Sequence, residues 1–438
     1  MTGERQELAA LLLAQGAGID GVPLVEGESR LEAVGRGLAG AGVRPGDPVV
    51  LAGLRGRDLL LAAVAAWRLD AVPAPVPTTS GAPAALEGAC RVGADLAVAP
   101  KQAGAPVPDL SGTAVLHLSS GSAGRPKVVR REVGSLVVEA EGYRVGLALT
   151  PEDRVAVPIP LVHSLGWGVA MSALVNGSGV EVTPLAGAGS VARRIDSGAV
   201  SVVAMTPPLA RLLVATQRRG DGGLRTAVVG AGPVSGELAD AFRTRFGVSP
   251  LRGYGSSETG GTFCGTEGIG RALPGVEVLR PQAGETGELV LRLAAPVQGY
   301  LDSGEPPTHE WWTGDVVRRE PGGIVRFVER IRGPLRLNGR FVDVSAMDAD
   351  LRAQPGVDDV HFLAVPRRSA PESEDFFVVV AGPGAAGADL ADRVELVAAG
   401  VPVPRLIRCD RLPSTAIGKP DREAMIELVR KDDAVARP

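Results

Sequence analysis

The sequence predicts an α/β protein that has a large N-terminal domain of parallel, helix-covered sheets, a small β subdomain and a small α+β C-terminal domain. Three observations predict it. The chain has 438 residues, which leaves room for two or three domains of ordinary size. Strand-like and helix-like segments alternate over residues 31–246, and short strands with few helices follow from about residue 275. The 59 glycines and 35 prolines supply the many turns of such a fold and follow no collagen-like period.

The N-terminal elements alternate in type along the chain. Apolar residues at helical spacing predict helices, and short apolar runs bounded by turn residues predict strands. Strands that alternate with helices favour a parallel sheet covered on both faces. The helices are expected at 31–41, 57–69, 165–174, 209–216 and 236–246, and the strands at 48–53, 113–118, 153–158, 180–184, 199–205 and 226–229.

The pattern changes after about residue 275. Strands expected at 276–279, 287–293 and 316–319 indicate a mainly β segment. The tail that begins after residue 328 is predicted to be a separate α+β unit. It is expected to hold helices at 344–353 and from 422 onward, and strands at 361–365 and 376–380.

Composition and charge argue against several classes of function. The 50 acidic and 46 basic residues give a net charge of −4, so we expect neither nucleic acid nor an anionic membrane as a partner. Cys90, Cys264 and Cys409 are far apart and form no C-x-x-C pair, which argues against a disulfide framework and a cysteine zinc site. The longest apolar run, 59–67, is far shorter than the ~20 residues that span a bilayer. The first residues lack a secretory pattern, and the expected location is the cytoplasm.

A glycine- and hydroxyl-rich segment follows the strand expected at 113–118. It is Leu118-Ser-Ser-Gly-Ser-Ala-Gly-Arg-Pro-Lys127. Backbone N–H groups and hydroxyls in such a loop donate hydrogen bonds to an anion, and the lysine adds charge, which suits a polyphosphate. Only four of the 46 basic residues are lysines, and Lys127 and Lys419 lie in glycine-containing turns. The spacing is not that of the Walker A motif, so this segment alone fits either a phosphate-binding loop or a surface turn.

Further motifs occur in order along the chain. They are Pro160-Leu-Val-His-Ser-Leu-Gly166, Gly230-Ala-Gly-Pro233, Gly253-Tyr-Gly-Ser-Ser-Glu258, Gly287-Glu-Leu289, Gly299-Tyr-Leu301, Trp312-Thr-Gly-Asp315, Arg330 through Gly339 and Leu412-Pro-Ser-Thr-Ala-Ile-Gly-Lys419. With the segment 118–127, this ordered set resembles the adenylate-forming (ANL) superfamily of acyl- and aryl-CoA synthetases, adenylation domains of nonribosomal peptide synthetases and luciferases. The resemblance covers the chain from about residue 30 and implies an AMP-forming ligase that uses ATP and Mg²⁺.

The resemblance implies a nucleotide site. The loop would hold the β- and γ-phosphates of ATP, Tyr254 would offer an aromatic face to adenine, and Glu258, a lone carboxylate in a Gly- and Ser-rich turn, would bind Mg²⁺. Asp315, in an expected Thr-Gly-Asp turn, would accept hydrogen bonds from both ribose hydroxyls, and Arg330 would add a second ribose contact. The residues assigned to the nucleotide are Ser119, Ser120, Gly121, Ser122, Gly124, Lys127, Gly230, Ala231, Gly232, Tyr254, Gly255, Ser256, Ser257, Asp315 and Arg330.

The resemblance also implies a mobile C-terminal domain. The adenylation core would comprise residues 1–328, with the β subdomain at about 275–328, and would be followed by a hinge at 329–334 and a lid at 335–438. Lys419 on the lid would contact both the carboxylate and the α-phosphate, and so would remove the repulsion between these anions. The lid would rotate about the hinge, where this chain has Arg332, for a second half-reaction.

The acid pocket is expected to involve His163, Trp167, Pro207 and Gly253. Relatives that activate α-amino acids carry an aspartate where this chain has His163, so the resemblance favours a small aryl or acyl carboxylic acid. A buried structural role is the alternative for His163. The expected catalytic set is Lys127, His163, Glu258 and Lys419.

The acceptor of the acyl group is open. The resemblance implies a thiol, either that of CoA or the phosphopantetheine arm of an acyl carrier protein. Arg336 stands where relatives often carry a lysine linked to thioester formation, and Phe341 follows Gly339 where some CoA ligases have a polar residue. An amine acceptor, or nitrite in place of the acid, is therefore an alternative. A non-catalytic nucleotide-binding scaffold is a third interpretation, against which the intact catalytic set argues.

Overall fold

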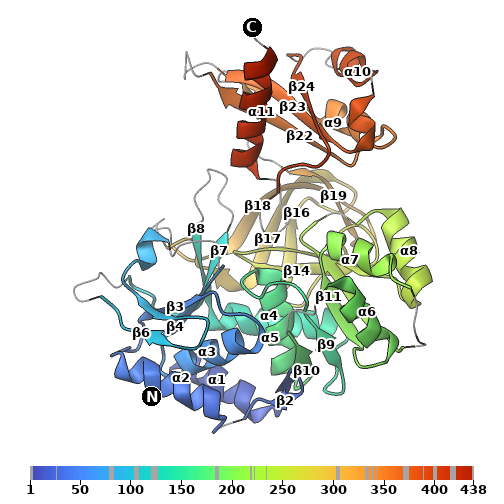
Figure 1. The fold of residues 1–438 in the computed structure, drawn as a ribbon. Coiled ribbons are helices and arrows are strands. Elements are labelled where there is room, and N and C mark those ends of the chain that lie inside the picture. The colour runs from blue at the N-terminus through green and yellow to red at the C-terminus, as the bar shows by residue number, and fades with distance from the viewer. Residues whose placement is uncertain are drawn as a thin grey trace. The chain divides into compact units, whose positions relative to one another are not determined.

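Helices and strands alternate along the chain (Figure 1). The computed structural model describes all residues except 1–2, 26, 78–82, 103–107, 120–126, 183–186, 218–219, 221, 233, 302–305, 331–334, 338–339, 343, 368–373, 388, 398–401, 415–420 and 437–438. At 119, 329–330, 335–337, 340–342, 345–346, 366, 386, 396–397, 422–423 and 433–436 it describes the backbone only. The chain forms two compact units, one of residues 1–313 and 317–328 and the other of residues 314–316 and 329–438.

The helices are α1 (Glu4–Ala14), α2 (Ser29–Gly40), α3 (Gly56–Arg68), α4 (Val133–Gly146), α5 (Ser164–Val175), α6 (Ala188–Asp196), α7 (Pro207–Val214), α8 (Gly236–Phe246), α9 (Ser345–Arg352), α10 (Asp389–Val397) and α11 (Arg422–Ala436). The strands are β1 (Gly18–Ile19), β2 (Val22–Pro23), β3 (Pro48–Ala52), β4 (Val72–Val76), β5 (Cys90–Val92), β6 (Val98–Ala99), β7 (Thr113–Ser119), β8 (Lys127–Glu132), β9 (Arg154–Ala156), β10 (Gly179–Glu181), β11 (Val202–Met205), β12 (Thr226–Gly230), β13 (Leu251–Ser256), β14 (Gly260–Gly265), β15 (Arg271–Ala272), β16 (Val276–Arg280), β17 (Thr286–Val297), β18 (Thr308–Arg319), β19 (Val325–Arg330), β20 (Leu335–Leu337), β21 (Arg340–Val342), β22 (Asp359–Pro366), β23 (Glu374–Ala381) and β24 (Arg405–Cys409).

The largest sheet of the first unit has nine strands in the order β15-β14-β13-β12-β11-β9-β10-β1-β2. Its middle strands β13, β12, β11, β9 and β10 are parallel. Parallel neighbours need a crossover connection, and the helices α5, α6, α7 and α8 each lie between two of these strands in the sequence. The predicted α/β class with a parallel, helix-covered sheet is therefore confirmed.

Both faces of this sheet carry apolar side chains because successive residues of a strand point to opposite faces. In β11, Val202 and Ala204 belong to the hydrophobic cluster that includes residues of α4 and α5. Val203 and Met205 belong to a second cluster, formed with α6, α7 and α8. This double burial explains why the strand is apolar throughout rather than alternating.

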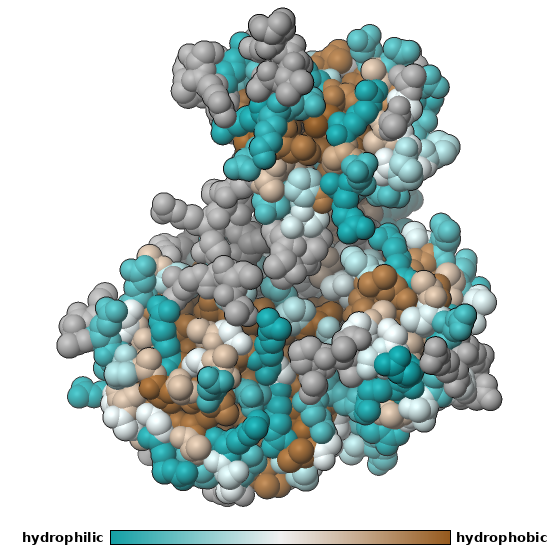
Figure 2. Space-filling view, viewed as in Figure 1, coloured by the Kyte–Doolittle hydropathy of each residue, from teal (hydrophilic) through white to brown (hydrophobic). Residues whose placement is uncertain are grey.

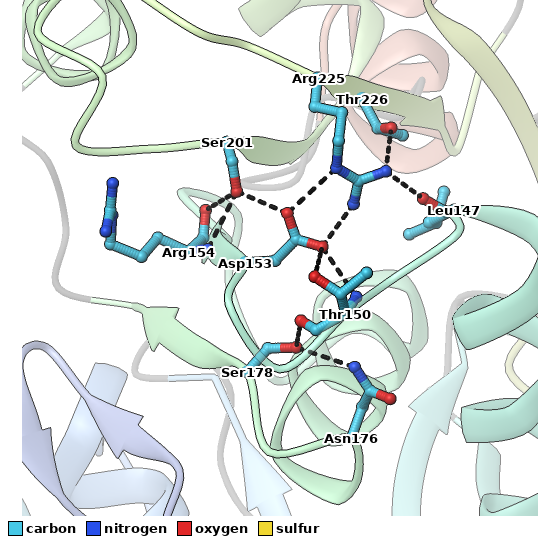
Figure 3. A network of polar contacts seen from close by, with 9 residues as sticks. All are labelled: Leu147, Thr150, Asp153, Arg154, Asn176, Ser178, Ser201, Arg225 and Thr226. Carbon is cyan, nitrogen blue, oxygen red and sulfur yellow. Dashed lines mark hydrogen bonds and ion pairs between the residues drawn. The ribbon is translucent and has the colours of Figure 1, made fainter.

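A polar network joins the amino ends of the neighbouring strands β9, β11 and β12 (Figure 3). Asp153, which is 4% exposed and precedes β9, accepts hydrogen bonds from Ser201 Oγ at 2.7 Å and Arg225 Nε at 3.2 Å. Thr150 N donates another at 2.8 Å. Burial alone would raise the pKa of Asp153, but the hydrogen bonds from Arg225, Thr150 and Ser201 outweigh it and hold that pKa below its ordinary value. Because Ser201 precedes β11 and Arg225 precedes β12, one carboxylate fixes three strand ends.

Smaller sheets complete the first unit. They are β4-β3-β5-β6, the β7–β8 hairpin and β16-β17-β18-β19. The last of these is the small β subdomain of the predicted fold class. On the face that Figure 2 shows, hydrophobic surface gathers over α7, the helix that carries Leu212 with 59% of its surface exposed. In the described part of the chain no helix combines the length and the apolar character needed to cross a membrane.

The second unit has its own core around the sheet β22-β23-β24. On one face, Val378 and Val380 of β23 pack with residues of α9 and α10. On the other face, Phe377 and Val379 pack with residues of α11. A separate hairpin, β20–β21, lies in the sequence between the end of the β subdomain and this sheet. The unit is the small α+β domain that the sequence predicts.

The structure corrects the expected turn at Asp315. This residue lies within β18, a strand of 12 residues. Gly314 has φ +70°, a value that glycine adopts without steric cost, so it gives the strand a local irregularity. Its presence before an aspartate suggests a turn in the sequence, but the neighbouring strands keep the segment extended.

Helix α4 is absent from the sequence-based prediction, as are α1, α6 and α10. Gly134, Gly142 and Gly146 lower the helix propensity of α4. Burial of Leu136 and Tyr143 in the large cluster outweighs that local cost, because tertiary packing routinely overrides propensity.

Candidate active site

The β7–β8 hairpin holds the two ends of the predicted phosphate loop next to each other. Its register pairs Ser119, the last residue of β7, with Lys127, the first residue of β8. Adjacent strands lie about 4.8 Å apart, so the hairpin closes the loop at this pair. Lys127 is exposed. The loop residues Ser120, Gly121, Ser122 and Gly124 lie outside the described residues, as does the side chain of Ser119.

Tyr300 contacts both the lysine and the carboxylate that the sequence assigns to phosphate and metal. Nζ of Lys127 lies over the Tyr300 ring, 4.5 Å from its centre. The Tyr300 hydroxyl donates a hydrogen bond to Glu258 Oε1 at 2.8 Å. The structure therefore brings Lys127 and Glu258, which are 131 residues apart in number, to one aromatic ring. Tyr300 belongs to one of the motifs, yet no role follows from its sequence position.

Ser257 and Glu258 lie in the turn between β13 and β14, as the sequence predicts. Ser256 Oγ and Thr259 Oγ1 are 3.1 Å apart, and Thr259 N donates to Ser256 Oγ at 3.3 Å. These short hydroxyl contacts close the turn from within, as serine and threonine often do. The Glu258 backbone is therefore fixed by its neighbours.

The surroundings of Glu258 fit a magnesium ion held mainly by other ligands. Among the described residues, no three His, Cys, Asp or Glu side chains gather into a metal-binding cluster. Of those residues only Tyr300 donates a hydrogen bond to Glu258, and it does so to Oε1. Mg²⁺ keeps several waters and takes one or two carboxylates together with substrate phosphates. A single half-buried carboxylate beside a phosphate loop is such a donor set.

A buried ion pair anchors the same hairpin. Arg131 Nη2 lies 3.0 Å from Glu139 Oε2, and the two side chains are 1% and 3% exposed. Glu139 Oε1 accepts a hydrogen bond from Gly261 N at 2.9 Å. Since Arg131 belongs to β8, Glu139 to α4 and Gly261 to β14, these contacts link the hairpin to α4 and β14. No sequence motif marks these residues, and the sequence analysis missed them.

The carboxyl ends of β12 and β13 bring several predicted residues together. Gly230 and Gly253 are partners in the register of these parallel strands. Ala231 has φ +63°, which is uncommon for a residue with a Cβ atom and is typical of functional sites. A methyl group on Gly232 would lie 3.2 Å from Cγ of Pro207. Ligands of open α/β sheets bind beyond the carboxyl ends of the strands, so this edge fits a nucleotide.

Tyr254 is half-buried in β13. Its ring packs edge-on against Phe263 of β14, with centroids 5.7 Å apart and an interplanar angle of 73°. Next to it, a side chain on Gly255 would collide with the carbonyl of Gly260, so glycine is required for the close approach of the two strands. Packing on Phe263 fixes the orientation of the tyrosine ring and leaves part of its surface accessible.

The residues expected near the acid differ in burial. His163 is the N-cap residue of α5 and is half-buried. Trp167 is fully buried and packs edge-on against Trp67 at 5.9 Å and His117 at 5.5 Å. Its indole N–H has no hydrogen-bond partner among the described residues. The structure gives Trp167 a core position, and its role as a wall of the acid pocket remains a prediction.

His117 is a buried neighbour of this group that the sequence analysis missed. It is 1% exposed and lies in β7. Burial, followed by the charges of Arg131 and His163, lowers the pKa of His117 to about 3. The ring is therefore uncharged near neutral pH. A histidine within an apolar strand carries no signal in the sequence, because only the packing reveals its surroundings.

The remaining predicted residues lie within the β subdomain or follow it in the sequence. Asp315 is 4% exposed in β18, and Arg330 ends β19. Arg332, Gly339 and Lys419 lie outside the described residues. Arg336 and Phe341 are partners in the register of the β20–β21 hairpin. The two residues that differ from the pattern expected of thioester-forming relatives therefore lie opposite each other in this hairpin.

Comparisons with known proteins agree with this geometry. The family described as AMP-binding enzyme matches residues 85–301. A feruloyl-CoA synthase from Amycolatopsis is 26% identical over 444 residues, which covers 89% of this chain and 90% of that protein. The ATP-bound structure of MatB from Rhodopseudomonas palustris has a TM-score of 0.77 at 19% identity and covers 98% of this chain and 99% of that one.

The amide bond synthetase McbA from Marinactinospora thermotolerans also has this fold, with a TM-score of 0.70 at 19% identity over 97% of this chain and 99% of that one. The predicted family, fold class and AMP-forming enzyme class are confirmed by these matches. The chain therefore belongs to the adenylate-forming (ANL) superfamily and is an enzyme of its AMP-forming acid–thiol ligase class.

Proposed function

We propose that this enzyme activates a small aryl or acyl carboxylic acid as its acyl-adenylate and then transfers the acyl group to a thiol. The observation that carries the proposal is the contact of one tyrosine with both Lys127 and Glu258. A lysine at the base of a phosphate loop and a carboxylate suited to Mg²⁺ together match the charges of Mg·ATP. A lysine together with a carboxylate suits a polyphosphate bound with its metal ion better than a simple anion, because a simple anion would need no carboxylate.

In the first half-reaction an oxygen of the acid attacks the α-phosphorus of ATP. The bond between this phosphorus and the bridging oxygen breaks, and pyrophosphate leaves with the electron pair. Lys127 and the loop 119–124 hold the β- and γ-phosphates, and Glu258 holds the Mg²⁺. When bound, Mg²⁺ neutralises part of the charge on the phosphates. Tyr254 and the segment 230–232 hold adenine, and Asp315 and Arg330 hold the ribose.

His163 supports a carboxylate substrate by its position. It occupies the N-cap position of α5, and the first backbone N–H groups and the dipole of a helix favour an anion. We propose that the acid binds with its carboxylate near this helix end and its apolar part toward Pro207 and Gly253. The similarity to feruloyl-CoA synthase, whose name gives an aryl acid and CoA, supports an aryl acid among the substrates.

The thiol is that of CoA or of an acyl carrier protein, and the enzyme works in the cytoplasm. A second candidate is an amine acceptor, which would give an amide. It is favoured by the pairing of Arg336 with Phe341 in the β20–β21 hairpin, since both depart from the pattern linked to thioester formation. The similarity to an amide bond synthetase supports this candidate as well.

The test is acid-dependent exchange of pyrophosphate into ATP across aryl acids, short- and medium-chain acids, amino acids and nitrite. Exchange with one acid class, followed by AMP formation only when CoA is added, would support the thiol ligase. Exchange without turnover on CoA would direct the search to carrier proteins and amines. If the protein binds ATP but no acid promotes the exchange of pyrophosphate into ATP, the adenylation proposal is wrong. That result would favour the non-catalytic scaffold instead.

A matched variant tests the division of labour between the half-reactions. We expect Lys419→Ala to lower the exchange rate by about 10²- to 10³-fold, because a charge on the reacting oxygens is lost. Attack of the thiol on separately supplied acyl-adenylate should stay near the wild-type rate. Lys431→Ala, which removes another lysine of the same unit, is the control. Equal loss of both half-reactions in Lys419→Ala would contradict the assigned role.

A further inference from the structure

The backbone around Tyr300 is bound to the strand that begins with Lys127. Leu301 N donates to Val128 O at 2.8 Å, and Arg130 N donates to Gly299 O at 3.0 Å. The segment 299–301 thus runs along β8 as an additional antiparallel neighbour. Tyr300 is therefore held opposite Val129, two residues after Lys127, although it follows Lys127 by 173 positions in the sequence.

The side chain of Tyr300 uses two different surfaces for two opposite charges. The face of the ring receives the ammonium of Lys127 at 4.5 Å from the centroid, where the negative charge of the π-system attracts cations. The hydroxyl donates to Glu258 Oε1 at 2.8 Å. Neither Lys127 nor Glu258 forms an ion pair with any residue of the described chain. One tyrosine thus satisfies both charges and stands in place of a direct lysine–glutamate pair.

This arrangement matters because both charged groups must change partners when Mg·ATP binds. An ion pair between them would neutralise the lysine that phosphate needs and occupy the carboxylate that Mg²⁺ needs. A cation–π contact and a hydrogen bond from a neutral hydroxyl leave the full charge of each group available. They also restrict the rotamers of two flexible side chains, which lowers the entropy cost of binding.

From this geometry we infer that Tyr300 is a positioning residue for Mg·ATP: it orients Glu258 toward the metal and Lys127 toward the phosphates and keeps the two from pairing. Tyr300 acts through these neighbours and touches no reacting atom. The inference rests on the proposed adenylation function and gives a role to the motif Gly299-Tyr-Leu301, to which that function assigns none.

The turn that carries Glu258 has other supports. Glu139 Oε1 accepts from Gly261 N at 2.9 Å, and Ser256 and Thr259 bond to each other within the turn. Loss of the Tyr300 hydroxyl therefore leaves the backbone of the turn in place. Its effect should be confined to the orientation of the Glu258 carboxylate.

Two variants separate the contacts. Tyr300→Phe keeps the ring under Lys127 and removes the hydroxyl, whereas Tyr300→Leu removes both. We would measure binding of the β,γ-imido analogue of ATP by calorimetry over a range of Mg²⁺ concentrations, without any acid. Tyr300→Phe should raise the Mg²⁺ concentration for half-maximal binding by about three- to tenfold, as expected for one lost hydrogen bond, and leave metal-free affinity unchanged. Tyr300→Leu should also weaken the metal-free analogue.

The control is Tyr143→Phe, which removes the hydroxyl of a buried tyrosine next to Gly261 and should not change the Mg²⁺ dependence. In pyrophosphate exchange, excess Mg²⁺ should restore the maximal rate of Tyr300→Phe. An unchanged Mg²⁺ dependence in Tyr300→Phe, or an equal weakening with and without Mg²⁺, would overturn the inference. Failure of the wild-type protein to bind the analogue with Mg²⁺ would instead contradict the proposed function.

Discussion

The two ends of the nine-stranded sheet use their polar groups in opposite ways. At the amino ends of β9, β11 and β12, Asp153 accepts hydrogen bonds from Thr150, Ser201 and Arg225. Ser178 Oγ extends the network by donating to Thr150 O at 2.8 Å (Figure 3). These donors and acceptors form hydrogen bonds with one another, and such mutual hydrogen bonding is typical of a network with a purely structural role.

At the carboxyl ends of β12 and β13 the chain is rich in glycine, and its polar side chains form fewer hydrogen bonds with other described residues. Gly230 and Gly253 lie side by side, Ala231 has a positive φ, and Glu258 receives a single hydrogen bond from the described residues. Such an edge costs stability. The sheet tolerates it because the opposite end of β12 is fixed, together with the corresponding ends of its neighbours β11 and β9. Stability and ligand binding are thus divided between the two ends, and variants at each end should show different effects.

The largest effect is expected at the amino end. Asp153→Ala removes five hydrogen-bond contacts from a side chain that is 5% exposed. It should lower the free energy of unfolding by about 3 kcal/mol, measured by urea unfolding. Pyrophosphate exchange per folded molecule should stay unchanged. Asp240→Ala, which breaks an exposed pair with Arg243, should cost less than about 1 kcal/mol. Impaired pyrophosphate exchange with an unchanged free energy of unfolding would contradict the proposed division of stability and ligand binding between the two ends of the sheet.

The opposite result is expected at the carboxyl end. Glu258→Gln keeps the shape and the hydrogen bond from Tyr300 but removes the charge that Mg²⁺ requires. It should lower the exchange rate by about 10²-fold, or about 2.7 kcal/mol, for every acid alike. Thermal unfolding without ligand should be unaffected. Glu267→Gln changes an exposed carboxylate and is the matched control. A stability loss as large as that of Asp153→Ala would show that Glu258 is structural.

The alternation of helices and strands could be predicted because it depends on local spacing. The helix expected at 236–246 is found at Gly236–Phe246, since its apolar residues follow one face. Helix α4 could not be predicted in this way, because its stability comes from burial against distant strands. The turn expected at Asp315 failed for a similar reason: β-sheet neighbours decide the conformation of a Gly-Asp pair that is ambiguous alone.

The candidate site was predictable where its chemistry is carried by short segments. Lys127 and Glu258 lie in recognisable glycine-rich sequences, although their roles stay predictions. The contacts that position them were not predictable. Tyr300 and Glu258 are 42 residues apart, and Glu139 and Gly261 are 122 apart. Nothing local in either pair specifies its partner, so only the folded chain reveals the support of the site.

A smaller effect, on selectivity, is expected from His163. Because it caps α5 near the carboxyl end of β9, His163→Ala should change the ranking of acids by about tenfold, the size of one hydrogen bond to a charged group. Binding of the ATP analogue with Mg²⁺ should remain at the wild-type level. Exchange rates across the acid panel provide the measurement, with His361→Ala in the second unit as control. Unchanged rates for all acids would favour a structural role for His163.

The last effect is a difference in pH dependence. The pKa of His117 is about 3 in the folded chain against 6.5 for an ordinary histidine. Between these values the unfolded chain binds more protons than the folded chain, so the free energy of unfolding decreases by up to about 1.4 kcal/mol for each unit by which the pH is lowered. The pKa of Asp153 is also lowered, but from 3.8, so its contribution persists above about pH 4 and is lost only at lower pH.

Two variants separate these ranges. His117→Phe should flatten the pH dependence of unfolding between about pH 6.5 and 4, because no neutral imidazole remains to be protonated on unfolding. Asp153→Ala should be less stable throughout but keep that slope. The fluorescence of Trp167, which packs against both His117 and Trp67, reports the transition in urea. If His117→Phe keeps the wild-type slope, the buried histidine is not the group that makes the fold acid-sensitive in this range.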